Sequence, residues 1–244
     1  MSRLRIPSPS IPDLVFVCLA LAVPLALSQQ LLNSDGDLGR HIRVGDYILS
    51  HGLLHQDIFS FTKLGEPFVG YEWLSEALAA LAYRHGGLPL VAVGCGLLIG
   101  ATYWVIARLL LREGVDPFLS YLTAIVAAIV GSVHWLARPH LFTLLGVALV
   151  ISLLERARES DGKGSPAWAF IPLFAVWANL HGGFLFGLIV IGTYLAGDIA
   201  EVVTGGDRTR WLTRARQDAV ALAASAFGTL LTPYGIHLPL HVLG

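Results

Sequence analysis

The stretch LPLVAVGCGLLIGATYWVIARLLL, residues 88–111, decides the fold. It carries one charged side chain, Arg108, and an α-helix of about 20 apolar residues is long enough to cross the hydrocarbon core of a bilayer. The rest of the chain has the same character, because 55% of its 244 residues are hydrophobic and only 14% are charged. Soluble domains carry about 25% charged residues. We therefore predict an integral membrane protein.

Six further apolar stretches lie on either side of this one. They are residues 11–32, 118–135, 141–154, 168–180, 184–200 and 219–231. Backbone amides in lipid must find hydrogen-bond partners within the chain, so each stretch is expected to be a helix. The sequence thus predicts an all-α, polytopic protein with about seven transmembrane helices, the first of them kinked at Pro24.

The long polar segment after the first helix divides the chain into three parts. Residues 1–32 are the expected cytoplasmic N-terminus and first helix, 33–87 a large first outer loop, and 88–244 the remaining six helices. Within the loop, residues 71–83 place apolar side chains at helical spacing. This segment is predicted to be an amphipathic helix at the membrane surface.

The basic residues set the orientation of the helices. With the N-terminus in the cytoplasm, eleven Lys and Arg residues fall on the inner side and five on the outer side, as the positive-inside rule requires. The inner set is Arg3, Arg5, Arg108, Arg112, Arg156, Arg158, Lys163, Arg208, Arg210, Arg214 and Arg216. The outer set is Arg40, Arg43, Lys63, Arg84 and Arg138.

All nine histidines fall on the outer side in the same threading. The stretches 141–154, 168–180 and 219–231 are also shorter than the roughly 20 residues that a span needs. Charged loops hold their inner ends, so we expect the polar junctions at their outer ends to form a recess below the membrane surface. Polar groups at that depth usually face a wet cavity. A tilted bundle without a cavity is the alternative.

The first polar motif is NSDGD at residues 33–37, directly after the first helix. Asp35 and Asp37, with His41 and Arg43 close behind, can supply a general base or oxygen ligands for a divalent cation. A solvated loop is the alternative, because two carboxylates at this spacing are a weak signal alone.

The later junctions add further candidates. Arg138 and His140 flank a proline and need an anionic partner, either a phosphate group or the aspartates of the first motif. Asn179 and His181 precede paired glycines, where they can bind a sugar hydroxyl or a phosphate oxygen, or cap a helix break. Two more side chains complete the candidate set: Glu72 in an aromatic patch and Tyr234 after the last helix.

Charge and cysteine content narrow the function classes. The net charge of −1 argues against a nucleic-acid partner. The two cysteines, Cys18 and Cys95, lie within apolar stretches and form neither a disulfide framework nor a CxxC metal motif.

Several segments in this order resemble the bacterial membrane proteins of the GT-C glycosyltransferase superfamily, of the type of dolichyl-phosphate-mannose mannosyltransferases and lipid A aminoarabinose transferases. Besides Asp35 and Asp37, the segments are HIRVG at 41–45, DIFSFT at 57–62, YEWL at 71–74, RPHLFT at 138–143, WANLHGG at 177–183 and PYG at 233–235. Relatives are longer, and they carry aromatic residues where this chain has Gly39 and Arg40. The resemblance therefore suggests a truncated member.

The resemblance implies an inverting transferase that takes a sugar from a polyprenyl-phosphate donor at the outer face of a bacterial inner membrane. Asp37 or Asp35 would take the proton from the hydroxyl of a glycan, lipid or protein acceptor. Arg138, His140 and His181 would stabilise the phosphate leaving group. The substrate-binding set would be completed by His41, Arg43, Glu72, Asn179 and Tyr234. No cofactor is certain; Mg²⁺ or Mn²⁺, held by Asp35 and Asp37, remains an open expectation.

A non-catalytic membrane protein is the competing interpretation. It includes a transporter, a metal-binding or assembly subunit, and an inactive GT-C relative. The nearly uncharged helix centres argue against a transporter, because transporters often place polar groups at the bilayer midplane.

Overall fold

The computed structural model describes residues 10–159 and 167–243, and their regular secondary structure is helical apart from one isolated β-bridge between Gln56 and Pro67. Within these ranges the structure contains ten α-helices and one 3₁₀ turn. They are α1 (Ile11–Ala26), α2 (Ser28–Asn33), α3 (Asp37–His51), α4 (Trp73–Arg112), α5 (Pro117–Gly131), η1 (Ser132–His134), α6 (His140–Glu159), α7 (Ala167–Leu180), α8 (Phe184–Val203), α9 (Arg208–Thr229) and α10 (His237–Leu243). The predicted all-α class is confirmed.

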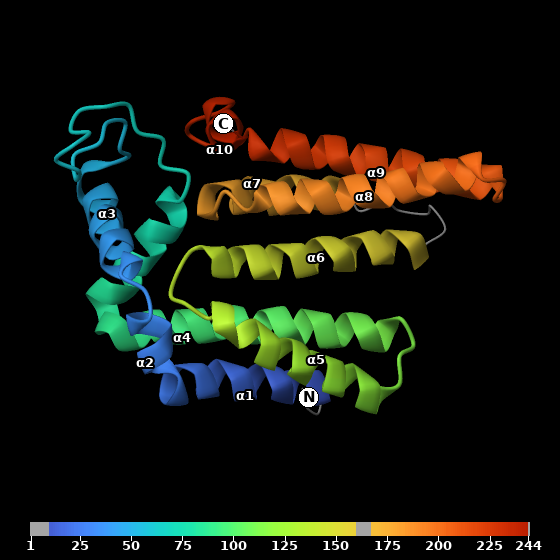
Figure 1. Cartoon of the computed structure of the whole chain (residues 1–244), viewed down its shortest axis with the longest axis horizontal. Helices are drawn as coiled ribbons and strands as arrows, with labels where there is room; N and C mark the ends of the chain where they lie inside the picture. The colour runs from blue at the N-terminus through green and yellow to red at the C-terminus, as the bar shows by residue number, and fades with distance from the viewer. Residues whose placement is uncertain (1–9, 160–166, 244) are drawn as a thin grey trace, which may run out of the picture.

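The long helices lie side by side and alternate in direction along the chain (Figure 1). Helices α2, α3 and α10 and the first part of α4 gather at one end of this bundle, which we call the α3 end. The segments that join α5 to α6 and α7 to α8 lie at the same end. The polar motifs of the sequence are therefore collected at one end of the molecule.

The buried apolar side chains form two clusters. The first cluster joins α1 to α5 around residues such as Val23, Ile99 and Trp135. The second joins α6 to α10 around Phe174 and Ile191. The bundle thus has two hydrophobic cores, and they meet where α4 contacts α6 and α7.

Glycines bring α1 and α4 into close contact. A Cβ atom at Gly96 would lie 2.8 Å from the Ala20 carbonyl oxygen, and one at Gly100 would lie 2.9 Å from the Phe16 carbonyl oxygen. Small residues four apart are typical of helix pairs in membranes, because they allow the two backbones to approach.

The predicted amphipathic helix and the span after it form one kinked helix. α4 runs through both, and the change of direction falls at Gly87, whose φ of 61° is the left-handed conformation that glycine tolerates. Similarly, the stretch 11–32 is divided at Leu27 into α1 and α2. Pro24 lies within α1 as expected, three residues before this break.

Helix α3 was not predicted, because residues 33–70 were interpreted as a loop. Its apolar side chains nevertheless recur at helical spacing, and Leu38, His41 and Val44 are buried on one face. The face packs against the first part of α4. Charged residues separate these apolar side chains, so α3 contains no continuous apolar stretch.

Four helical segments are long and apolar enough to cross a membrane: α4, residues 117–134, α6 and α8. Large apolar side chains such as Phe118 and Ile189 are exposed on them, as expected for a surface that lipid covers. These segments indicate a multi-pass membrane protein.

The other apolar helices are shorter or more polar. α1 and α7 have 16 and 14 residues, and the first half of α9 carries four arginines. The expected shortness of 141–154 and 219–231 was wrong, since α6 and α9 have 20 and 22 residues. Both helices continue through charged residues, which an apolar window excludes.

Candidate functional site

Arg138 holds both aspartates of the first motif at the α3 end. Asp35 precedes α3, and Asp37 is its first residue. The Arg138 Nη2 atom donates to Asp35 Oδ1 at 2.5 Å and to Asp37 Oδ2 at 2.6 Å, and its Nε atom also contacts Asp35. One guanidinium therefore compensates two carboxylates. A cation bound by Asp35 and Asp37, as the sequence suggested, would be repelled by Arg138 at this position.

A second charged cluster lies between α3 and the start of α4. His41 Nδ1 is 3.2 Å from Glu76 Oε1 and 3.9 Å from Glu72 Oε2, and the Arg40 guanidinium is 3.4 and 3.5 Å from the same two carboxylates. His41, Glu72 and Glu76 are only 4%, 8% and 2% exposed. Burial raises the pKa of Glu72, and the nearby positive charge of His41 opposes this rise.

His181 approaches the same cluster from the junction of α7 and α8. Its Nδ1 atom accepts a hydrogen bond from the Gly183 backbone amide at 3.0 Å and lies 2.8 Å from Thr143 Oγ1. Because the amide can only donate, Nδ1 carries no proton, and the proton of the neutral ring is on Nε2. That Nε2 faces Glu72 Oε1 at 3.6 Å. Burial lowers the pKa of His181 to about 4.

Five of these side chains line one pocket of about 360 Å³: Asp37, His41, Glu72, Arg138 and His181. Arg40, Tyr71, His134 and Pro139 are also part of its wall. The structure thereby brings together six of the site residues that the sequence suggested: Asp37, His41, Glu72, Arg138, His140 and His181. They come from four places along the chain, which meet because all four lie at the α3 end (Figure 1).

Other suggested residues make structural contacts near the pocket. Arg43 is largely exposed and pairs weakly with Asp46 at 3.9 Å. Asn179 accepts a hydrogen bond from the Trp73 indole at 2.6 Å and donates to the Leu231 carbonyl at 3.0 Å, which ties α4, α7 and α9 together.

Tyr234 and Asp35 also make structural contacts and are not among the residues that line the pocket. The Tyr234 hydroxyl donates to the Leu54 carbonyl at 2.9 Å and so attaches the segment after α3 to the C-terminal helices. Asp35 is mostly covered by Arg138.

Two members of the buried cluster were absent from the suggested set. Glu76 lies four residues after Glu72 on the same helix, and a carboxylate among apolar residues on a buried face is a signal that could have found it. The signal that could have identified Arg40 is its position next to His41 in the sequence. The sequence does not indicate that Arg40 and Glu76 pair with each other, because α3 itself was not predicted.

An apolar groove of about 520 Å³ adjoins the polar pocket. The two share His41, Arg138 and Pro139 as wall residues. Away from these residues the groove is lined by α4 side chains as far as Ala101, with Phe16 of α1 opposite. A polar pocket therefore lies directly beside an apolar groove that extends along the membrane-crossing part of α4.

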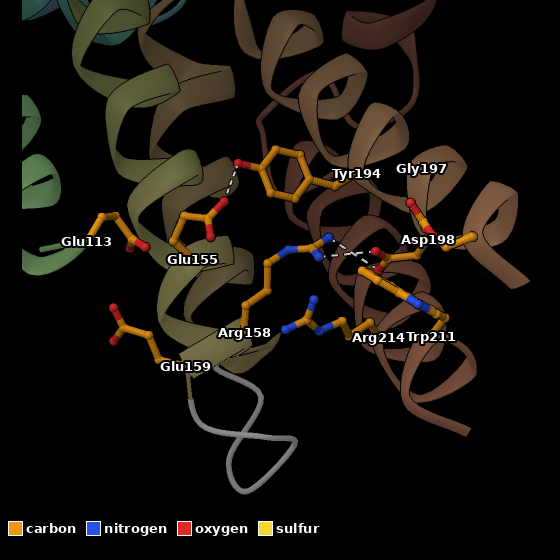
Figure 2. Close-up of a pocket in the computed structure, with 10 residues that line it drawn as sticks. Glu113, Glu155, Arg158, Glu159, Tyr194, Gly197, Asp198, Trp211 and Arg214 are labelled. Atoms are coloured by element: carbon orange, nitrogen blue, oxygen red, sulfur yellow. Dashed lines mark hydrogen bonds and ion pairs between the residues drawn. The ribbon is translucent and has the colours of Figure 1, made fainter. Parts of the chain in front are cut away.

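A different pocket lies at the other end of the bundle, and Figure 2 shows its charged side chains. Arg158 of α6 binds Asp198 of α8 at 3.1 Å and Asp218 of α9 at 3.0 Å. Its guanidinium also lies 4.7 Å from the ring centre of Tyr194, whose hydroxyl donates to Glu155 at 2.6 Å. Arg158 thus joins α6 to α8 and α9 through two ion pairs, as expected for a structural network.

No family model matches the sequence, and no curated protein and no solved structure is similar to it. The function must therefore be argued from the pocket and the groove.

Proposed function

We propose that the chain is a glycosyltransferase that moves a sugar from a polyprenyl-phosphate donor to an acceptor hydroxyl, by inversion at the sugar carbon. In this proposal α1, α4, α5, α6, α7, α8 and α9 cross a bacterial inner membrane, the N-terminus is cytoplasmic, and the α3 end faces outward. The distribution of Lys and Arg supports this orientation. The GT-C resemblance described above supplies the reaction type.

The observation that carries the proposal is the junction between the polar pocket and the apolar groove at His41, Arg138 and Pro139. A polyprenyl phosphate has a charged head and a long apolar chain. The phosphate head suits a pocket with arginine and histidine side chains. The apolar lipid chain suits the groove along α4, because burial of its surface there would favour binding. A water-soluble sugar nucleotide would leave the groove unused.

The pocket residues take roles that their positions allow. The Asp37 carboxylate is 47% exposed, and we assign it the proton of the acceptor hydroxyl as that oxygen bonds to the sugar carbon. The bond from the sugar carbon to the phosphate oxygen breaks in the same step. Arg138 and His140 at the groove junction stabilise the charge that develops on the departing phosphate.

The first experiment tests the groove. Gly94 lines it, and a Cβ atom there would meet open space, so Gly94→Leu should fill the groove without disturbing the helix. We expect the purified variant to bind undecaprenyl phosphate at least about tenfold more weakly, the effect of about 1.4 kcal/mol. Gly192→Leu is the matched control, because Gly192 also has open space but lies on α8 outside the groove.

The second experiment tests the chemistry. Asp37→Asn should retain lipid binding and lose transfer of sugar from polyprenyl-phosphate donors. Equal lipid affinity in the Gly94→Leu and Gly192→Leu variants would overturn the assignment of the groove. Transfer that survives in Asp37→Asn would overturn the assignment of the base.

One observation favours a non-catalytic role instead. Arg138 already satisfies both Asp35 and Asp37, so the motif is complete as a structural contact without any substrate. A lipid-binding or assembly subunit would show the groove effect of Gly94→Leu but no transfer with any donor.

A further inference from the structure

The cluster of His41, Glu72 and Glu76 has the composition of a metal site. One imidazole nitrogen and one oxygen of each carboxylate lie within 4.8 Å of one another, and all three residues are buried. Among the described residues this is the one group of His, Cys and acidic side chains with such spacing. Two carboxylates at this depth carry a large desolvation cost, which a bound cation would offset.

The distances within the cluster suit a metal site as well as an ion network. In the cluster the separations from His41 Nδ1 are 3.2 Å to Glu76 and 3.9 Å to Glu72. Ligand atoms about 2.1 Å from a tetrahedral metal ion lie about 3.4 Å from one another. The two separations from His41 Nδ1 lie on either side of this value, so small side-chain movements bring the three residues to ligand spacing.

We propose that His41, Glu72 and Glu76 bind one divalent transition-metal ion, Zn²⁺ or Mn²⁺. Mg²⁺ fits less well, because it prefers oxygen ligands and the site includes an imidazole nitrogen. His41 and Glu72 also line the polar pocket. Glu76 lies behind them and is 2% exposed, so an ion held by the three residues would have its remaining coordination position toward the pocket, as in sites where a metal contacts a substrate.

Two neighbours fit this assignment. The Arg40 side chain is 46% exposed, so its guanidinium can leave the carboxylates when the ion enters. His181 is held with its Nε2 proton toward Glu72 at 3.6 Å, and a small approach would let it donate to a ligating carboxylate without being a ligand itself. The metal's contact with a donor phosphate rests on the proposed function, whereas its binding to these three residues does not.

The test is a titration of the metal-stripped full chain in detergent with Zn²⁺ or Mn²⁺ alone. We expect one equivalent to bind, and Glu76→Gln to weaken binding on the order of 100-fold. Asp37→Asn is the matched comparison, because it removes the alternative carboxylate ligand of the same pocket and should leave metal affinity unchanged. Weak or absent binding by the wild-type chain, or a loss in Asp37→Asn but not in Glu76→Gln, would overturn the proposal.

A second variant distinguishes a metal site from a purely structural ion network. Arg40→Gln removes the cation that the metal must displace, so it should tighten metal binding severalfold. If the cluster were only an ion network, Arg40→Gln would lower the melting temperature and no added metal would restore it. X-ray absorption of the zinc-loaded wild-type chain should show nitrogen and oxygen ligands and no sulfur, and this readout needs no variant that must fold. Because none of these measurements uses a sugar donor, they fail or succeed independently of the transferase proposal.

Discussion

Removing Arg158 should destabilise the bundle more than any other single charge change at that end. Its side chain is 16% exposed, and the two carboxylates that it binds, Asp198 and Asp218, are 3% and 5% exposed. Arg158→Met leaves both carboxylates buried without a counter-ion, and loss of one partner from a buried pair costs about 3–5 kcal/mol. For a chain of this size that corresponds to a fall in melting temperature of roughly 6–20 °C.

The assay is thermal unfolding in detergent, followed by tryptophan fluorescence. Arg156→Met is the matched control, since Arg156 is exposed on the same helix and an exposed substitution changes stability by about 0.5 kcal/mol or less. The triple variant with Arg158→Met, Asp198→Asn and Asp218→Asn should recover most of the loss, because no uncompensated charge remains. A single variant that melts with the wild type, or a triple variant as unstable as the single one, would refute the reasoning.

Two further predictions concern the pocket. Burial lowers the pKa of His181 from 6.5 to about 4, so between these pH values the unfolded chain binds a proton that the folded chain does not, and the free energy of unfolding should fall as pH falls from 6.5 to 4. His181→Gln should flatten this part of the curve of melting temperature against pH. An unchanged curve would contradict the pKa shift. A Cβ atom at Gly45 would collide with the Glu76 carbonyl where α3 packs on α4, whereas Gly39 on the same helix has open space. Gly45→Ala should therefore lower both melting temperature and zinc affinity, with Gly39→Ala unchanged in both measurements; equal behaviour of the two variants would show that close packing of α3 on α4 is not required.

The helices could be predicted from the sequence because hydropathy is a local property. Each apolar stretch is helical, although 11–32 is divided into α1 and α2 and 88–111 is part of the longer α4. The ends also differ wherever a helix continues through charged residues, as α6 does through Arg158. α3 could not be predicted from apolar stretches, because its buried face consists of single residues, such as Leu38 and Val44, that stand between charged ones.

The sequence could predict where the site lies but not which of its side chains contact one another. Alternating helices place every second junction at the same end, so Asp37, Arg138 and His181 were expected to meet. Which side chains bind one another depends on the packing of α3 against α4 and on the kink at Gly87, and neither is encoded in the spacing of a motif. For this reason the suggested cation ligands, Asp35 and Asp37, are neutralised by Arg138, and the more suitable set lies at Glu72 and Glu76.

The two hydrophobic cores give the pocket a property that neither core has alone. Leu38 and Ala137, the chain neighbours of Asp37 and Arg138, belong to the first cluster, and Ala178 and Phe184, on either side of His181, belong to the second. The pocket therefore lies where side chains supported by the two clusters face one another. A molecule bound there would contact both parts of the chain, and its binding would stabilise the folded bundle as a whole.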